Sequence, residues 1–275
     1  MKNQIRVISL LAGVAAAILC AGFTEADQNL AEGVKNGDIE LVRSALADGA
    51  KVDGDAECTP DNPLISAITG NHDEIAVLLI ESGAQINVKD ANLRIPLHYA
   101  VIGGKTPLVT LLLQKGARVN AQDQNRLTAL HYAANGGDVG IVRDDSQNPD
   151  EKTLLSAAAD ELKWTGIAAL LIDRNADVNA ETIFHVTPLF YAAISGRAGV
   201  AKLLIDRGAD VNGATHEGKT PLHYAAEYGN FDVVKLLLKH GADRTLKDSK
   251  GQTPFDLIGN VRAVDVDALE MLLRP

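Results

Sequence analysis

The sequence predicts an all-α protein, a solenoid of stacked helix-turn-helix units, and the first observation behind this is a repeated phrase. The run from Thr220 reads Thr-Pro-Leu-His-Tyr-Ala-Ala, and closely similar runs begin at Ile95 and Thr128. Aligned on the leucine of this phrase, eight positions recur at intervals of 34, 33, 33, 25, 34, 33 and 33 residues: Leu30, Leu64, Leu97, Leu130, Leu155, Leu189, Leu222 and Phe255. We therefore expect about seven repeats and a C-terminal cap.

The second observation is that each unit carries the start and stop signals of two short helices. In the unit that begins at Thr187, the threonine is a good N-cap, and the proline after it suits the first helical position. Gly196 ends this helix, and apolar residues at helical spacing over 200–204 predict a second one. Gly208 stops the second helix, and a turn-forming stretch follows it. Because one helix pair cannot bury both of its apolar faces, neighbouring pairs must stack into a continuous core.

These phrases, with closes such as Gly208-Ala209 and Gly241-Ala242, resemble the ankyrin repeat family. The resemblance implies a solenoid whose helix pairs are joined by short β-hairpin-like loops. It also implies that His98, His131 and His223 bond backbone groups between repeats, rather than sharing a metal ion.

A different segment precedes the repeats. Lys2 and Arg6 come before an uncharged apolar stretch from Val7 to Phe23, which is the layout of a secretory signal peptide. We expect residues 1–26 to be removed, with an approximate cleavage site, and residues 27–275 to form one ankyrin-repeat domain of an exported bacterial protein, periplasmic or secreted. The alternative is an uncleaved N-terminal helix that anchors the protein in a membrane, because the stretch reaches the lower edge of a spanning length.

One interval of 25 residues departs from the pattern. After Gly137 the chain has no Leu-Leu run and no Gly-Ala close until well past Asn148-Pro149, where Glu151 completes a capping signature. The sequence therefore predicts a shortened repeat at 124–151, with the next helix starting near Asn148. Two interpretations stay open: a deletion that bends the solenoid, or a specialised acidic edge, 144–151, that meets a partner.

The charge of the chain indicates which partners to expect. Without Lys2 and Arg6, the mature chain would hold 24 basic and 36 acidic residues, a net charge of −12. Such a surface repels nucleic acid and favours a protein partner with a basic face. Cys58 would be the only mature cysteine, so no internal disulfide can form. No later apolar run is long enough for a membrane span, and we expect a monomer without membrane contact after cleavage.

No motif supports catalysis or a cofactor. Gly136 and Gly137 follow a helix rather than a strand, so the context of a phosphate-binding loop is missing. The serines lie in no nucleophile elbow, and Cys58 has no histidine at a recognisable spacing. We therefore predict no catalytic residue, no metal site and no cofactor.

The binding surface is inferred from the resemblance. Ankyrin proteins bind partners in a concave groove lined by hairpin tips and by exposed positions of the first helix. The matching tip positions here are Asn92, Arg94, Asn125, Leu127, Phe184, Val186, Glu217 and Lys219. The matching helix positions are Ile102, Asn135, Ser195, Glu227 and Tyr228. Exposed aromatic residues are favoured interface anchors, which singles out Phe184 and Tyr228.

The resulting functional prediction is a non-catalytic protein-protein interaction module in the cell envelope, a scaffold that binds a protein through its concave face. The alternative is an inhibitor or immunity protein that neutralises an exported toxin or enzyme. An enzyme or metal-binding protein is disfavoured, because the sequence shows no convergent polar cluster.

Overall fold

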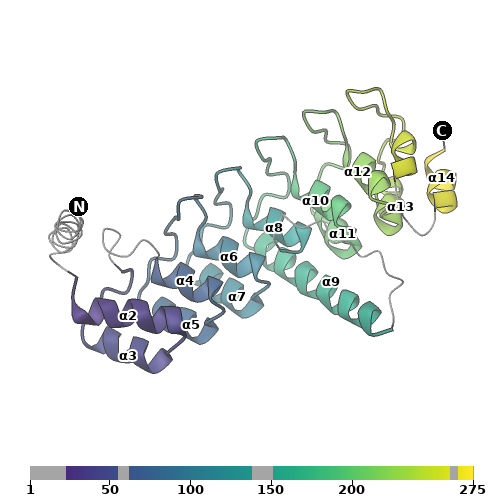
Figure 1. The fold of residues 1–275 in the computed structure, drawn as a ribbon. Coiled ribbons are helices and arrows are strands. Elements are labelled where there is room, and N and C mark those ends of the chain that lie inside the picture. The colour runs from purple at the N-terminus through teal and green to yellow at the C-terminus, as the bar shows by residue number, and fades with distance from the viewer. Residues whose placement is uncertain (1–22, 55–61, 138–150, 261–265, 275) are drawn as a thin grey trace, which may run out of the picture. The chain divides into compact units, whose positions relative to one another are not determined.

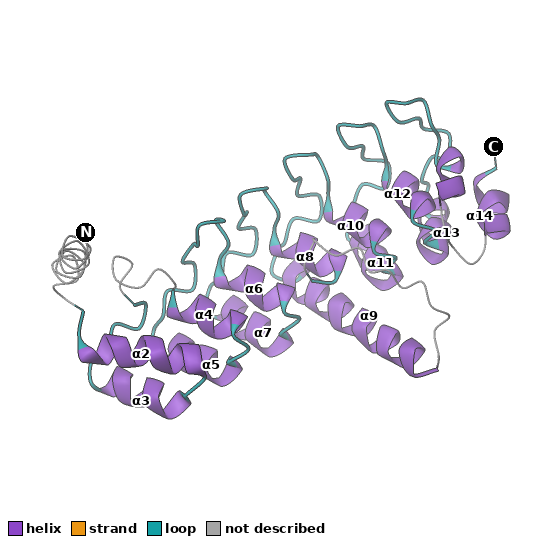
Figure 2. Ribbon diagram, in the orientation of Figure 1, coloured by secondary structure: helices purple, strands orange, loops and turns teal. Residues whose placement is uncertain are grey.

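A computed structural model describes residues 23–54, 62–137, 151–260 and 266–274. In these residues every regular element is a helix (Figure 2). The chain divides into two compact units, Met1–Ala91 (unit 1) and Asn92–Pro275 (unit 2). The expected signal peptide lies almost wholly in residues 1–22, outside the described part of the chain.

The described residues of unit 1 form four helices: α2 (Glu25–Asn36), α3 (Ile39–Ala47), α4 (Pro63–Thr69) and α5 (Asp73–Glu81). Helix α2 packs on α3 and α4, and α4 packs on α5. Thr24 caps α2 by accepting the Asp27 N–H, while the Asp27 carboxylate accepts the Thr24 N–H at 2.8 Å. The other oxygen of Asp27 accepts the Lys51 N–H at 2.8 Å. This buried carboxylate therefore joins the start of α2 to the loop that follows α3.

Unit 2 contains a first-helix layer and a second-helix layer (Figure 1). The first layer is α6 (Pro96–Ile102), α8 (Ala129–Asn135), α10 (Pro188–Ile194), α12 (Pro221–Glu227) and the 3-10 helix η1 (Phe255–Asn260). The second is α7 (Thr106–Gln114), α9 (Glu151–Ile172), α11 (Ala198–Asp206), α13 (Phe231–Lys239) and α14 (Val266–Leu273). Within each layer every helix contacts the next one. This is the expected solenoid arrangement.

The leucines of the repeated phrase form the core. Leu97, Leu130, Leu189 and Leu222 are all fully buried. In the last pair, Leu269 and Leu273 of α14 are buried as well, which closes the stack. The register read from the sequence is confirmed at these positions.

The structure differs from the expected shortened repeat at 124–151, because Leu155 lies inside one long helix, and α8 and α9 together form a lengthened repeat. Helix α9 is 22 residues long, and it contains Leu155 instead of placing it in a separate first helix. It contacts α8 on one side and lies between α7 and α11 in the second-helix layer. The distance from Leu130 to the next phrase leucine, Leu189, is therefore 59 residues, which is 26 more than the regular 33. The described residues of both units hold six helix pairs and a closing pair rather than seven pairs and a cap.

The C-terminal half of α9 explains this assignment. Residues 166–179 read Gly-Ile-Ala-Ala-Leu-Leu-Ile-Asp-Arg-Asn-Ala-Asp-Val-Asn, and residues 199–212 of the next repeat match them closely. Ile167 and Leu171 are fully buried, as Val200 and Leu204 are at the same positions of α11. The close of this repeat is present, but Asn175, at φ 64°, replaces the usual glycine.

Candidate functional site

The hairpin tips of unit 2 are shaped by turn residues that bond their own backbone. Asp123 accepts the N–H groups of Asn125 and Leu127 at 2.8 and 2.9 Å through one carboxylate oxygen. The Thr182 hydroxyl and the Asp248 carboxylate do the same in later hairpins. Because these short side chains hold the loop in a fixed turn, the residues between the bonded amides project outward.

One position of each tip adopts the left-handed conformation. The φ values are 61° at Leu93, 63° at Arg126, 57° at His185, 73° at Gly218 and 78° at Gly251. Three of the five residues are not glycine, although this conformation costs an L-residue about 1 kcal/mol. Large side chains are therefore displayed at tip positions where glycine would be the least strained choice.

Backbone hydrogen bonds link each tip to the next. Gln124 N–H donates to Asn92 O at 2.9 Å, Ile183 N–H to Asn125 O at 3.2 Å, and Ser249 N–H to Glu217 O at 2.8 Å. The bond to Ile183 joins hairpins on either side of the lengthened repeat, so the added residues do not interrupt the series. We call the residues at these tips the tip row: 92–93, 124–126, 183–185, 216–218 and 249–251.

The surface positions expected to bind a partner fall into three groups. Asn92, Asn125, Phe184, Glu217 and Tyr228 are exposed. Arg94, Val186, Lys219 and Glu227 are half-buried, as are the additional helix positions Ile102 and Asn135, whereas Ser195 is exposed. Leu127 is 4% exposed, so the expectation that it lines a surface is wrong. Its side chain belongs to the core because it follows the tip, directly before the buried Thr128.

Two of the half-buried positions bond to each other. Lys219 Nζ donates to Glu227 Oε2 at 2.6 Å and lies 5.2 Å from the centre of the Tyr224 ring. Burial alone would lower the pKa of Lys219, but the hydrogen bond and charge of Glu227 raise it. Lys219 therefore fastens a hairpin to α12 and is a structural residue as well as a surface one.

Arg94 has a similar structural role. Its Nε lies 3.7 Å from the Asp123 carboxylate, and its guanidinium lies over the rings of Tyr99 and Tyr132. The hydroxyl of Tyr132 donates to the same carboxylate oxygen, Asp123 Oδ2, at 2.7 Å. Arg94 thus links the first two repeats of unit 2, and its side chain is only 25% exposed.

The structural role implied for the three phrase histidines is confirmed. Nδ1 of His131 accepts the Thr128 N–H at 3.0 Å, and its Nε2 lies 3.2 Å from Val186 O of the next hairpin. His98 and His223 make the same bonds, reaching Ala121 O and Gln252 O. Burial lowers the pKa of His131 to about 4, so the ring is neutral, accepting at Nδ1 and donating at Nε2.

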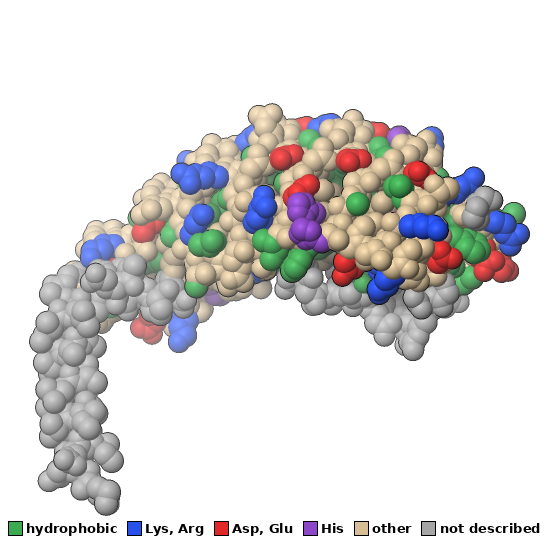
Figure 3. All heavy atoms as spheres, turned by 90° about the horizontal axis from the view of Figure 1, so that it is seen from above, with side chains coloured by type: hydrophobic (Ala, Val, Ile, Leu, Met, Phe, Trp, Pro, Cys, Tyr) green, Lys and Arg blue, Asp and Glu red, His purple; other side chains and the backbone are tan. Residues whose placement is uncertain are grey.

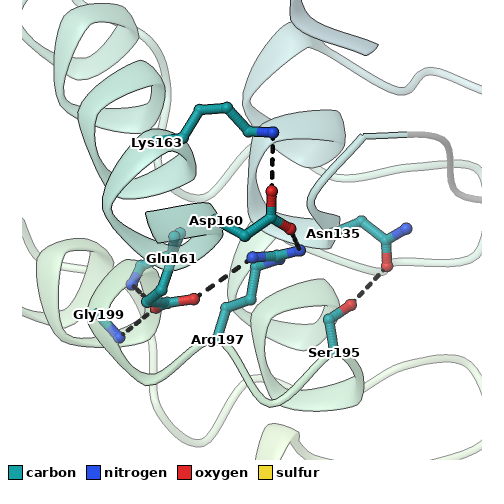
Figure 4. Close-up of polar contacts among 8 residues, drawn as sticks. Asn135, Asp160, Glu161, Lys163, Ser195, Arg197 and Gly199 are labelled. Carbon is teal, nitrogen blue, oxygen red and sulfur yellow. Dashed lines mark hydrogen bonds and ion pairs between the residues drawn. The ribbon is translucent and has the colours of Figure 1, made fainter. Parts of the chain in front are cut away.

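A charged cluster that sequence reasoning missed surrounds Arg197 (Figure 4). Arg197 is 9% exposed, and its guanidinium lies 3.4 Å from Glu161 and 3.5 Å from Asp160, both on α9. Lys163 Nζ lies 2.8 Å from the other oxygen of Asp160. The guanidinium also lies 5.6 Å from the Trp164 ring centre. Arg197 therefore joins the lengthened repeat to the one that follows.

Glu161 also caps a helix of the next repeat. Its Oε1 accepts the N–H of Gly199 at 2.7 Å and of Val200 at 3.3 Å, in the first turn of α11. The side chain of Arg197, the N-cap residue of α11, makes no hydrogen bond with these amides. A carboxylate at a helix N-terminus satisfies open donors and is favoured by the helix dipole. Glu161, in the part of α9 that regular repeats lack, thus caps α11 in place of a side chain of α11's own N-cap residue.

The only sequence signal for this cluster is a position, not a motif. Arg197 occupies the N-cap of a second helix, and Asn230 holds the same place one repeat later, where its amide donates to Ala193 O and Ile194 O. Each side chain lies against the glycine at the end of the first helix of the preceding repeat: Arg197 against Gly136, after α8, and Asn230 against Gly196, after α10. The position is therefore a regular contact between repeats.

The described residues contain no group of three or more His, Cys, Asp or Glu side chains arranged to hold a metal ion. In the same part of the chain, α9 included, no helix is both long and apolar enough to cross a membrane.

The chain matches two models of protein families. Residues 154–248 match ankyrin repeats (3 copies), and residues 64–112 and 97–144 match ankyrin repeats (many copies). These matches cover well over half of the chain. No curated protein matches it in sequence. Among solved structures, the crystal structure of the human ASB11 ankyrin repeat domain is similar, with a TM-score of 0.70 and 24% identity over 90% of this chain and 98% of that one. At this identity the likeness concerns the fold alone.

Proposed function

Because the chain belongs to the ankyrin repeat family, we propose that it is a non-catalytic module that binds a protein partner through the tip row and the adjoining first helices of unit 2. The observation that carries this proposal is the exposure of large apolar side chains there. Phe184 is 63% exposed, Tyr228 is 40%, and Leu93 and Ile183 are 44% and 43%. Aromatic side chains of this kind are frequent anchors at protein interfaces.

Site-specific photo-crosslinking tests this proposal. A photoreactive phenylalanine analogue at Phe184 should capture a protein from an envelope extract. The same analogue at Met271, which is 81% exposed on α14, is the matched control and should capture nothing specific. Equal capture at both positions would reject the tip row as the binding surface.

We propose that the partner is met in the cell envelope, after export. The basic start and the apolar stretch from Val7 to Phe23 support this location. The cap of α2 favours cleavage before Thr24, because removal of Thr24 would leave the buried Asp27 without two of its bonds. Mass spectrometry of the envelope protein should find a first residue at or just before Thr24. An intact Met1 in the membrane fraction would support the anchored alternative, and an intact Met1 in the cytoplasm would reject export.

Two roles are compatible with such binding. A scaffold would be recovered with several envelope proteins, whereas an inhibitor or immunity protein would be recovered with one exported target. The acidic excess expected to attract a basic partner lies mainly in unit 1, whose sequence carries a net charge of −8 from 6 basic and 14 acidic residues. A basic-faced target is therefore an alternative partner, which would meet unit 1 rather than the tip row of unit 2. The number of proteins recovered in a pull-down discriminates between the two roles.

A further inference from the structure

The tip row of unit 2 differs in charge from the chain as a whole. The chain carries a net charge of −10, yet the tip row has a single acidic side chain, Glu217. The same row contains two basic side chains, Arg126 and Lys250, and two exposed histidines, His185 and His216. The surface that displays the apolar anchors is thus the part of the molecule where acidic side chains are scarce.

Two of the carboxylates next to the tips are buried in their own turns. Asp123 and Asp248 are 3% and 7% exposed, and each accepts two backbone N–H groups of its own turn. Glu181 is exposed, but its Oε2 lies 2.6 Å from Nδ1 of His185. Asp123 and Asp248 therefore shape the hairpins, and Glu181 contacts His185, so that Glu217 is the single acidic side chain of the tip row itself, beside Arg126 and Lys250.

The two histidines lie beside the largest apolar side chains. Their ring centres are 4.2 Å apart in an edge-on arrangement that joins two neighbouring hairpins. Phe184 directly precedes His185, and its carbonyl accepts the His216 N–H at 3.5 Å. Seen from above, the purple histidines have green hydrophobic side chains below them, a blue Lys or Arg side chain to the left and a red acidic side chain directly against them (Figure 3).

We propose that the tip row of unit 2 binds a segment of the partner that is acidic and also carries apolar or aromatic side chains. The inference rests on the proposed function and specifies the chemistry of the partner at that site. Phe184 and Ile183 supply the apolar contact area, which gives most of the affinity at such anchors. Arg126 and Lys250 supply complementary charge, which speeds association and rejects basic partners.

Selection from a library of random 12-residue peptides, displayed against the immobilised full chain, tests the proposal. The enriched peptides should be net acidic and rich in aromatic or aliphatic residues. Their affinity, measured by fluorescence anisotropy, should fall as salt is raised, because exposed charges are screened. Enrichment of basic peptides, or of none, overturns the inference.

Matched variants locate the binding. The double variant R126E/K250E should bind the enriched peptide roughly tenfold more weakly, whereas K235E/K239E on α13, with the same change of net charge, should bind as the parent does. F184A should weaken binding roughly thirtyfold, as an anchor does, and M271A should not. Equal affinities in the tip-row variants and their controls overturn the inference. The proposed function would then still stand if photo-crosslinking at Phe184 captures a folded protein.

Discussion

The regular repeat α12–α13 and the lengthened repeat α8–α9 solve the same packing problem with different contacts. Both bury the phrase leucine and bond the phrase histidine to the next hairpin. The N-cap side chains that reach back to the preceding repeat differ, however: Asn230 belongs to α13 of the regular repeat itself, whereas Arg197 belongs to α11, in the repeat after α8–α9. Asn230 reaches back to two carbonyls of the preceding repeat, whereas Arg197 is enclosed by carboxylates and a tryptophan of α9. An ankyrin stack can thus accept 26 additional residues between two helices if new polar contacts fix the added helix.

The contacts of Asn230 and Arg197 also contribute differently to the stability of the fold. A neutral amide bonded to carbonyls contributes about 1 kcal/mol to stability. A buried guanidinium needs charged partners, and removing one side of such a pair leaves the other uncompensated. The lengthened repeat therefore depends more strongly on a single side chain than the regular one does.

The largest expected effect is common to both repeats. Leu130→Ala and Leu222→Ala should each lower the free energy of unfolding by about 2–5 kcal/mol, because both side chains are fully buried. Leu162→Ala, the matched control at a site 75% exposed on α9, should change it by less than about 0.5 kcal/mol. Chemical denaturation measures all three. If Leu130→Ala were as mild as the control, the lengthened repeat would not share the common core.

Acid should destabilise the fold through the phrase histidines. The pKa of His131 is lowered to about 4 by burial, so the unfolded chain binds a proton more readily between pH 4 and the ordinary histidine value near 6.5. The free energy of unfolding should thus fall by up to about 3 kcal/mol as pH drops through this window, and stay level above it.

The matched comparison for this effect is His131→Gln against His185→Gln. The first removes one buried titrating ring and should weaken the dependence of stability on pH, while His98 and His223 keep the rest of it; the second removes an exposed ring and is the comparison. Denaturation at pH 7, 5.5 and 4 distinguishes them. An unchanged pH dependence in His131→Gln would contradict a neutral, buried imidazole.

The next largest effect on stability concerns the contact that distinguishes the two repeats, made by Arg197 in one case and by Asn230 in the other. Arg197→Ala should cost about 2–3 kcal/mol, because two partly buried carboxylates each lose one charged partner, and Asn230→Ala should cost about 1 kcal/mol. Trp164, the only tryptophan of the chain, should change its fluorescence in the first variant and not in the second. Equal costs and identical spectra would show that the cluster around Arg197 contributes nothing beyond a regular contact.

The smallest expected effect concerns the surface. Phe184→Ala should leave the free energy of unfolding within about 0.5 kcal/mol of the parent, since the side chain is 63% exposed. A larger loss would mean that Phe184 supports the hairpin, and its effect on binding would no longer report a contact with the partner.

The regular repeats could be predicted from the sequence because their signals are local. Threonine, proline and glycine mark helix ends, and Nδ1 of the phrase histidine accepts the N–H group three residues before it. The lengthened repeat was misread because Leu155 happens to stand in a Leu-Leu pair at a plausible interval. The match of residues 166–179 to 199–212 was visible in the sequence and would have corrected the error.

The contacts around Arg197 lie beyond such reasoning. Asp160 and Glu161 are 37 and 36 residues away from it in the chain, and no motif links them. The burial of Leu127 and the pairing of Lys219 with Glu227 likewise depend on how side chains turn at each hairpin. In the candidate site, the sequence could place the tips but not decide which of their side chains face outward.

Two deletions test the lengthened repeat most directly. Removing 138–163 brings Leu130 and Leu189 to the regular 33 residues and places Trp164 at the N-cap position, and Arg197→Asn in the same variant restores the contact that Asn230 makes. Removing 131–155 instead would restore the register only if 124–151 were a separate, shortened repeat. We expect a single cooperative unfolding transition in urea for the first variant and none for the second. The reverse result would contradict the assignment of α8 and α9 to one repeat.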